Sequence, residues 1–211
     1  MNTKTVAIFG ATGFSGRSVL SELLARGHRV RALARRPAAL ETHTNLTTVE
    51  GNALDPEAVA EVLTGTDAVI HCLGVGGKGN GAPTTLVSES VQLILDALGD
   101  SSSQRLICMS NVGAGDSGTF LAKRVVVPLF VRWLLPIIED KDRMEAALQA
   151  SKTDWLAVRF PNIVEGPAKD TKSCPNGRKT SLSITTESLA RYLVDQLSAE
   201  RIALRTPSVS N

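Results

Sequence analysis

The sequence has few aromatic residues, little net charge and no paired cysteines. Phe, Trp and Tyr together make up 4% of the 211 residues, and the formal net charge is +2. Such a chain offers few rings for stacking bases and no basic surface for a phosphate backbone, so we expect no nucleic-acid partner. The three cysteines have no paired spacing. They are typical of buried thiols in a reducing compartment.

Long hydrophobic runs are also absent. Residues 1–10, "MNTKTVAIFG", contain too short an apolar run for a signal peptide, which favours a cytoplasmic location. The apolar segment 125–138 is interrupted by Arg132 and two prolines, and it is shorter than the about 20 apolar residues of a membrane span. We therefore expect no membrane span and interpret this segment as a buried or lid-like element.

What remains is a regular alternation of strand-like and helical patterns, with no internal repeat. This alternation predicts an α/β fold with a doubly wound parallel sheet, in a single domain over residues 1–211. Segment 113–136 lies where such a fold places a small substrate lobe. The expected strands cover 5–9, 28–35, 46–49, 67–74, 104–110, 154–160 and 201–206; helices are expected from about residues 14, 55, 83, 137 and 185, and a loop over 161–180.

The first specific motif is "IFGATGFSG" at residues 8–16, in which Gly10, Gly13 and Gly16 recur at every third position. The motif follows a strand pattern and opens a helix pattern. Glycine tolerates a positive φ and lets backbone N–H groups approach a pyrophosphate, and the helix directs its N-terminal dipole to the same point. The placement favours a dinucleotide phosphate site. Such glycines also occur in plain strand-to-helix turns.

The end of the second strand predicts which dinucleotide binds. An NAD site places a carboxylate there for the ribose 2′-hydroxyl, but no Asp or Glu occurs between Arg29 and Leu40. Arg35 and Arg36 stand there instead, and guanidinium groups favour the 2′-phosphate of NADP(H). The alternative is that the two arginines only solvate a sheet edge.

Taken with "GNALD" at 51–55, "ICMSN" at 107–111 and the stretch 140–163, these motifs resemble the atypical short-chain dehydrogenase/reductases, and most nearly their NADPH-dependent biliverdin-IXβ/flavin reductase type. The resemblance extends over residues 4–198 and implies a Rossmann fold that binds NADP(H). It further implies phosphate contacts at Gly10, Thr12, Gly13, Phe14 and Ser15, adenine contacts at Asn52 and Ala53, ribose contacts at Leu73 and Gly74, and a place for Ser110 beside the nicotinamide. Two residues depart from the pattern: Asn52 replaces the usual Asp, and Asn162 replaces a histidine near the nicotinamide.

The usual proton donor of short-chain dehydrogenases is missing. These enzymes use Tyr-x-x-x-Lys, in which a phenol protonates the alkoxide formed by hydride addition. The helix after residue 137 places Lys141 at the lysine position and Ile137 at the tyrosine position. Lys141 falls within the apolar face of Ile137, Met144 and Leu148, so we expect it to point inward; the alternative is that it reaches past its neighbours to solvent.

The missing phenol limits the acceptor. A ketone needs a good acid, whereas a flavin-, quinone- or tetrapyrrole-like ring spreads the negative charge and takes a proton later. The sequence therefore predicts an NADPH-dependent reductase for a flat conjugated acceptor, with Ser110 and Lys141 as catalytic residues. Ser110 is alternatively a turn-capping serine. The alternative function is an NADP(H)-binding sensor without turnover.

Two further features complete the expectations. Segment 113–136 is predicted to form a wall or lid over the nicotinamide end, or else to bury its apolar face in a homodimer. The three histidines have no metal-like spacing, so no metal site is expected. His28 and His43 are predicted to lie in solvent-exposed loops and His71 in the core.

Overall fold

The central element of the protein is an eight-stranded sheet in the order β3-β2-β1-β4-β5-β6-β10-β8. The computed structural model describes residues 3–75, 81–100, 102–115, 117, 132–175, 177, 179–200 and 202–211. Neighbouring strands run parallel, except that β8 is antiparallel to β10. The strands are β1 (Thr5–Phe9), β2 (Arg29–Ala34), β3 (Leu46–Glu50), β4 (Ala68–His71), β5 (Arg105–Asn111), β6 (Asp154–Phe160), β8 (Lys172–Cys174) and β10 (Ser208–Ser210).

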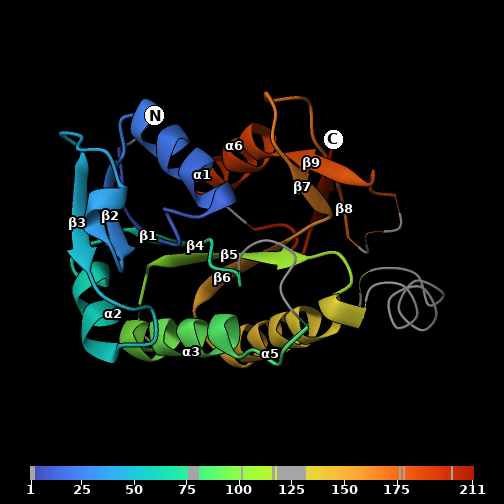
Figure 1. Cartoon of the computed structure of the whole chain (residues 1–211), viewed down its shortest axis with the longest axis horizontal. Coiled ribbons are helices and arrows are strands. Elements are labelled where there is room, and N and C mark those ends of the chain that lie inside the picture. Colours follow the sequence, from blue (N-terminus) through green and yellow to red (C-terminus); the bar gives the residue numbers. More distant parts are fainter. Residues whose placement is uncertain are drawn as a thin grey trace.

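Helices cover both faces of this sheet (Figure 1). On one face lie α1 (Phe14–Ala25) and α6 (Thr186–Asp195), and on the other lie α2 (Pro56–Leu63), α3 (Leu86–Leu98) and α5 (Leu135–Ala150). Short 3-10 turns occur at Pro37–Ala39 and Arg132–Leu134. The expected doubly wound α/β architecture, a Rossmann fold, is confirmed.

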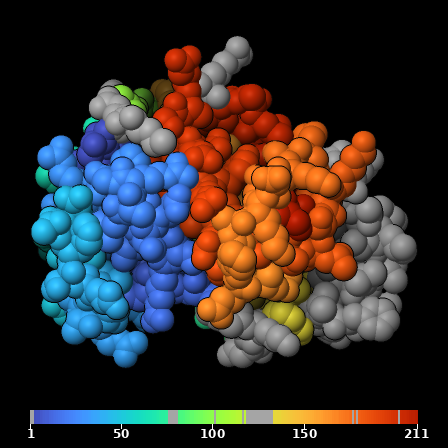
Figure 2. Space-filling view, turned by 90° about the horizontal axis from the view of Figure 1, so that it is seen from above, coloured from blue at the N-terminus to red at the C-terminus, as the bar shows by residue number. Residues whose placement is uncertain are grey.

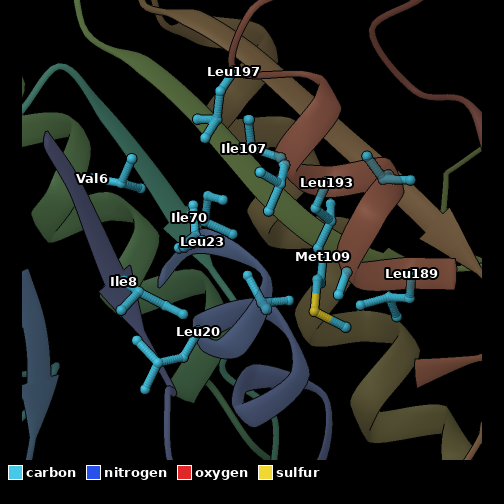
Figure 3. Packing of buried hydrophobic residues seen from close by; sticks show 14 of the residues in the cluster. Val6, Ile8, Leu20, Leu23, Ile70, Ile107, Met109, Leu189, Leu193 and Leu197 are labelled. Carbon is cyan, nitrogen blue, oxygen red and sulfur yellow. The ribbon is translucent and has the colours of Figure 1, made fainter. Parts of the chain in front are cut away.

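The alternation of side chains along the strands builds two separate hydrophobic cores. In β1, Val6 and Ile8 belong to the cluster under α1 and α6, whereas Ala7 and Phe9 belong to the cluster over α2, α3 and α5. Figure 3 shows leucines of α1 and α6 packed on β-strand residues of the first cluster, among them Ile70. Both faces of the strands are thus buried, which explains their nearly continuous apolar runs.

The predicted last strand, at residues 201–206, is wrong. The final strand is β10 at Ser208–Ser210, and its residues are fully buried. The chain already contacts β6 before this strand, because the backbone N–H groups of Ala157 and Arg159 donate to the carbonyls of Arg205 and Pro207. Small polar residues, not the apolar alternation before them, enter the sheet, so the hydrophobic pattern marks the wrong segment.

The predicted loop over 161–180 also contains regular structure. Strand β7 (Asn162–Val164) pairs with β9 (Ser183–Thr185) in a small second sheet, and β8 forms the edge of the main sheet. Figure 2 shows this part of the chain, in orange, beside α1 in blue on the face that carries α1 and α6. Runs of three residues are too short for a periodicity signal, which explains why the sequence did not indicate them.

His28 is buried, contrary to the prediction of a solvent-exposed loop, while His43 is exposed as predicted. The Nδ1 atom of His28 accepts a hydrogen bond from the backbone N–H of Lys4 at 3.1 Å. Burial, together with the nearby charges of Arg26 and Lys4, lowers its pKa. The ring ties the start of β2 to the start of β1.

Most of the predicted lid segment 113–136 lies outside the described residues, which include 113–115, 117 and 132–136 of it. Within the described part of the chain, no helix is long and apolar enough to cross a membrane. The same residues contain no group of three His, Cys, Asp or Glu side chains that could hold a metal ion.

Candidate active site

The glycine turn joins β1 to α1 at the carboxyl edge of the sheet. Gly10 has a φ of +82°, and a Cβ atom at this position would lie 2.9 Å from the carbonyl carbon and oxygen of Cys72. A Cβ atom on Gly16 would overlap the carbonyl oxygen of Gly10. Glycine is therefore required at both positions, at the first by backbone conformation and at both by close packing.

Gly13 has a different role, because its backbone has an ordinary extended conformation. A Cβ atom there would meet only the Gly10 carbonyl oxygen, at 3.2 Å, so the surface above the turn is open. Helix α1 starts at Phe14 without a side-chain cap, and the N–H groups of its first turn have no helical acceptors. Phe14 is 58% exposed and Ser15 is buried. An open turn before uncapped N–H groups fits the pyrophosphate of a dinucleotide.

The N-terminus of α3, also near the site, is already capped by a carboxylate. Asp140, which is 1% exposed, accepts hydrogen bonds from the backbone N–H groups of Val87 and Ser88 at 2.9 and 3.0 Å and from the Ser88 hydroxyl at 2.6 Å. A carboxylate from α5 thus caps α3. These hydrogen bonds fix the position of α5. Of the two helices α1 and α3, only α1 then has an N-terminus open to an anionic ligand.

The adenosine-side residues predicted from the sequence lie at the ends of β2, β3 and β4. Arg35 and Arg36 are exposed directly after β2. After β3, Asn52 is exposed, and its Oδ1 accepts a local hydrogen bond from the Leu54 N–H at 3.2 Å, which leaves one lone pair for a ligand. Ala53 is buried; after β4, Leu73 is half-buried and Gly74 faces open space.

Lys141 points into the protein. It is 4% exposed, and its Nζ atom donates to the carbonyl oxygen of Met109 at 2.6 Å and to that of Leu73 at 3.4 Å. The side chain therefore connects α5 with the ends of β5 and β4. Burial lowers the pKa of Lys141 to about 8, although the nearby thiol of Cys108 and the carboxylate of Asp140 act in the opposite direction.

Ser110 belongs to a buried charged cluster that the sequence reasoning missed. Its hydroxyl donates to Glu145 Oε1 at 2.7 Å. Arg159 donates to the same carboxylate through Nε to Oε1 at 3.0 Å and through Nη2 to Oε2 at 2.6 Å. The three side chains are between 1% and 3% exposed. Two signals were available: Glu145 stands four residues after Lys141, and Arg159 interrupts an apolar strand.

The loop after β5 closes over this cluster. Gly115 has a φ of +56°, and its N–H donates to Asp142 Oδ1 at 2.6 Å. A Cβ atom there would overlap Arg159 Nη2 and lie 2.7 Å from Glu145 Oε2. Only glycine fits over the ion pair, so the start of segment 113–136 packs directly on the cluster.

The remaining candidate residues lie on other elements or other turns of α5. Ile137, at the position of the missing phenol, is half-buried one turn before Lys141, and Asn162 is exposed in β7. His71 is buried with its Nε2 atom 2.7 Å from the Ser90 hydroxyl, and burial lowers its pKa to about 3. The ring is neutral at physiological pH and is part of the core, as predicted.

Residues 10–200 match the model of a family described as NAD(P)H-binding. The chain belongs to the NAD(P)H-binding family. Its cofactor is therefore NAD(P)H, and the glycine turn, uncapped helix and open strand ends described above are the features that fit it. This match confirms the NAD(P)H-binding class that the resemblance to the atypical short-chain dehydrogenase/reductases implies.

Curated relatives match this chain over very different lengths. The oxidoreductase stcQ of Emericella nidulans is 29% identical over 230 residues, which cover 96% of this chain and 81% of that protein. A 3-beta-hydroxysteroid dehydrogenase of Mycolicibacterium neoaurum is 38% identical over only 80 residues. That match covers 38% of this chain and 22% of the dehydrogenase, so the matched stretch is about a fifth of that protein's length.

Solved structures of the same fold cover nearly the whole chain. A short-chain dehydrogenase/reductase of Veillonella parvula in complex with NADP has a TM-score of 0.77 at 18% identity, covering 100% of this chain and 95% of that one. The anaerobilin reductase ChuY of Escherichia coli O157:H7 has a TM-score of 0.79 at 20% identity, with coverages of 98% and 96%. A proposed NADH-flavin reductase of Streptococcus pneumoniae has a TM-score of 0.80 at 20% identity and covers 99% of each chain.

Proposed function

We propose that the protein is an NADPH-dependent reductase that transfers hydride to a flat conjugated acceptor of the flavin, quinone or tetrapyrrole type. The observation that carries the proposal is the composition of one face of α5. Ile137 replaces the phenol, while Lys141 is retained, buried and bonded to the strand ends. Such a site holds the reactants but has no side-chain acid at the usual position.

The chemistry of the acceptor follows from that composition. NADPH, when bound, supplies the hydride. A conjugated ring spreads the added negative charge and takes its proton from water, so the site needs proximity and orientation more than an acid. Lys141 places a positive charge beside the ends of β4 and β5, where it stabilises a developing anion. Ser110 orients the reacting rings by a hydrogen bond.

The acceptor is covered, in this proposal, by segment 113–136. Gly115 ties the start of the segment to the Glu145–Arg159 pair, and a Cβ atom on Gly113 would lie 3.6 Å from Ile138 Cδ1. The segment also returns to α5, because Arg132–Leu134 leads directly into that helix. Both ends of the segment therefore meet α5, the helix that carries Lys141, and this supports a lid over the hydride site.

Stopped-flow oxidation of bound NADPH tests the proposal. We expect FMN, riboflavin, biliverdin or simple quinones to accelerate the loss of nicotinamide absorbance in the unmodified protein. Lys141→Met should slow this step at least tenfold, whereas Lys152→Met, which removes an exposed lysine, should not change it. Absence of acceptor-dependent oxidation across the whole panel would contradict the proposal.

A second candidate is an NADP(H)-binding regulator without turnover. It is favoured by the same replacement of the phenol by Ile137 and by the use of Lys141 Nζ in backbone hydrogen bonds. This candidate predicts tight NADPH binding with no oxidation by any acceptor, so the stopped-flow experiment separates the two.

A further inference from the structure

Ser110 has one hydrogen-bonding role left for a ligand, and Glu145 determines which. The serine hydroxyl donates its single proton to Glu145 Oε1. Because the carboxylate is paired through two hydrogen bonds with the Arg159 guanidinium, it is ionised and acts only as an acceptor. A hydroxyl whose proton is used in this way offers a ligand its lone pairs alone.

The environment keeps this arrangement fixed. Glu145 and Arg159 are each 1% exposed, so water does not compete for their hydrogen bonds. The backbone of Gly115 lies against both charged groups, with no room there for a side chain. Arg159 also lies directly opposite Ser110 in the register of β5 and β6. If the serine turned to another acceptor, the buried Glu145 Oε1 atom would lose one of its two hydrogen bonds.

Lys141 provides a complementary donor close to this acceptor. Its Nζ atom donates to the carbonyl oxygen of Met109, the residue that immediately precedes Ser110. An ammonium group has three N–H donors, and the described part of the chain provides acceptors for two of them, at Met109 and Leu73. A donor and an acceptor therefore meet at the carboxyl end of β5.

We propose that Glu145, held by Arg159, is a positioning residue that makes Ser110 recognise an N–H group next to a carbonyl. The proposal rests on the proposed function, which places the reacting rings at Ser110 and Lys141. Both reactants at a hydride-transfer site can carry such an amide-type edge. In the cofactor it is the nicotinamide carboxamide, and in the acceptor it is the imide of a flavin or the lactam of a tetrapyrrole. A quinone has carbonyls without an N–H and is disfavoured at this position.

Two matched pairs of ligands distinguish the two sources. NADP⁺ is compared with its 3-acetylpyridine analogue, in which a methyl group replaces the carboxamide amino group. Riboflavin is compared with 3-methylriboflavin, which lacks the imide N–H, each bound to the protein–NADP⁺ complex. Since one such hydrogen bond contributes about a factor of ten in affinity, we expect at least tenfold weaker binding of the N–H-free partner in one pair. The pair that discriminates identifies the group that Ser110 binds.

Variants separate hydrogen bonding from steric exclusion of the methyl group. In Ser110→Ala, the two ligands of the discriminating pair should bind with about equal affinity. The double variant Glu145→Met/Arg159→Met replaces the ion pair with apolar side chains of similar length and leaves the volume of Ser110 unchanged. Its free hydroxyl can then donate to a carbonyl as well as accept from an N–H, so the preference should fall. Glu145→Gln should keep the preference, because its amide oxygen still accepts from Ser110. An undiminished preference in the folded double variant, or any preference in Ser110→Ala, overturns the proposal.

The binding measurements do not depend on hydride transfer, so the two proposals fail separately. Discrimination within either pair without NADPH oxidation by any acceptor refutes the proposed function and supports the role of Glu145. Oxidation of NADPH with equal binding within both pairs refutes the role of Glu145 and leaves the function intact. Failure of NADP⁺ and riboflavin to bind at all overturns both.

Discussion

The ammonium nitrogen of Lys141 lies 2.6 Å from the carbonyl oxygen of Met109, so a charge from α5 is held against the backbone of β5. Burial of this charge lowers the pKa of Lys141 to about 8 from its ordinary value of 10.5. Between these two pH values, the unfolded chain retains a proton that the native protein has released. The native state therefore gains stability as the pH rises through this window.

The measurement is the free energy of unfolding in urea, compared between the unmodified protein and Lys141→Met. Subtracting the variant removes the contributions of those titratable groups that do not interact with Lys141. We expect the difference to shift by about 3 kcal/mol in favour of the unmodified protein between pH 7 and pH 10.5. If the difference in free energy of unfolding stays constant over this range, the pKa of Lys141 is not lowered in the native protein.

Gly13 and Gly16 should respond differently to the same substitution. Gly13→Ala adds a methyl group to the open surface of the turn, where only the Gly10 carbonyl oxygen lies within 4 Å. We expect the melting temperature to be nearly unchanged and NADPH affinity to fall at least tenfold, because the methyl group occupies the space of the pyrophosphate.

Gly16→Ala should instead destabilise the fold. Its Cβ atom would overlap the Gly10 carbonyl oxygen, so the start of α1 must shift away from β1. The expected cost is about 2 kcal/mol or more, measured by thermal or urea unfolding without cofactor. Equal loss of stability in both alanine variants would mean that the turn does not leave open space at Gly13.

Arg35 and Arg36 are predicted to select NADPH over NADH. Both side chains are exposed immediately after β2, where the 2′-phosphate would lie. Isothermal titration should show at least tenfold tighter binding of NADPH in the unmodified protein. Replacing both with alanine should weaken NADPH binding and leave NADH binding nearly unchanged.

The matched control removes the same charge elsewhere. Arg29 and Arg191 are exposed away from the carboxyl end of β2, so Arg29→Ala/Arg191→Ala should keep the preference. If the unmodified protein binds the two cofactors equally, the assignment of Arg35 and Arg36 is wrong.

The sequence predicts best those features that depend on local pattern. The order of the main strands and helices followed from periodicity, and the turn from three glycines, because both are encoded within a few residues. The Glu145–Arg159 pair could not be predicted in this way. Its members approach only through the tertiary packing of α5 on the sheet, and a bond between a helix and a strand leaves no spacing rule in the sequence. The final strand was missed for a similar reason, since Ser208 and Ser210 are buried by neighbouring strands and not by their own hydrophobicity.

Segment 113–136 gives the last prediction, since its role as a lid differs measurably from a role as a dimer interface. Trp133 lies beside the loop that follows β4, because a Cβ atom on Gly81 would be 3.6 Å from the Trp133 Cα atom. Phe130 belongs to the same segment but lies outside the described residues.

Phe130→Ala/Trp133→Ala tests the two roles together. A lid predicts that the KM for the acceptor rises about tenfold or more, as loss of aromatic surface weakens contact with a flat ring, while NADPH affinity is unchanged. Leu182→Ala is the control, because this leucine is 91% exposed and should alter neither quantity. An interface predicts instead that the sedimentation coefficient falls while acceptor kinetics persist. That outcome would assign the segment to a second subunit, because a lid that contacts the acceptor cannot lose two aromatic rings without a change in KM.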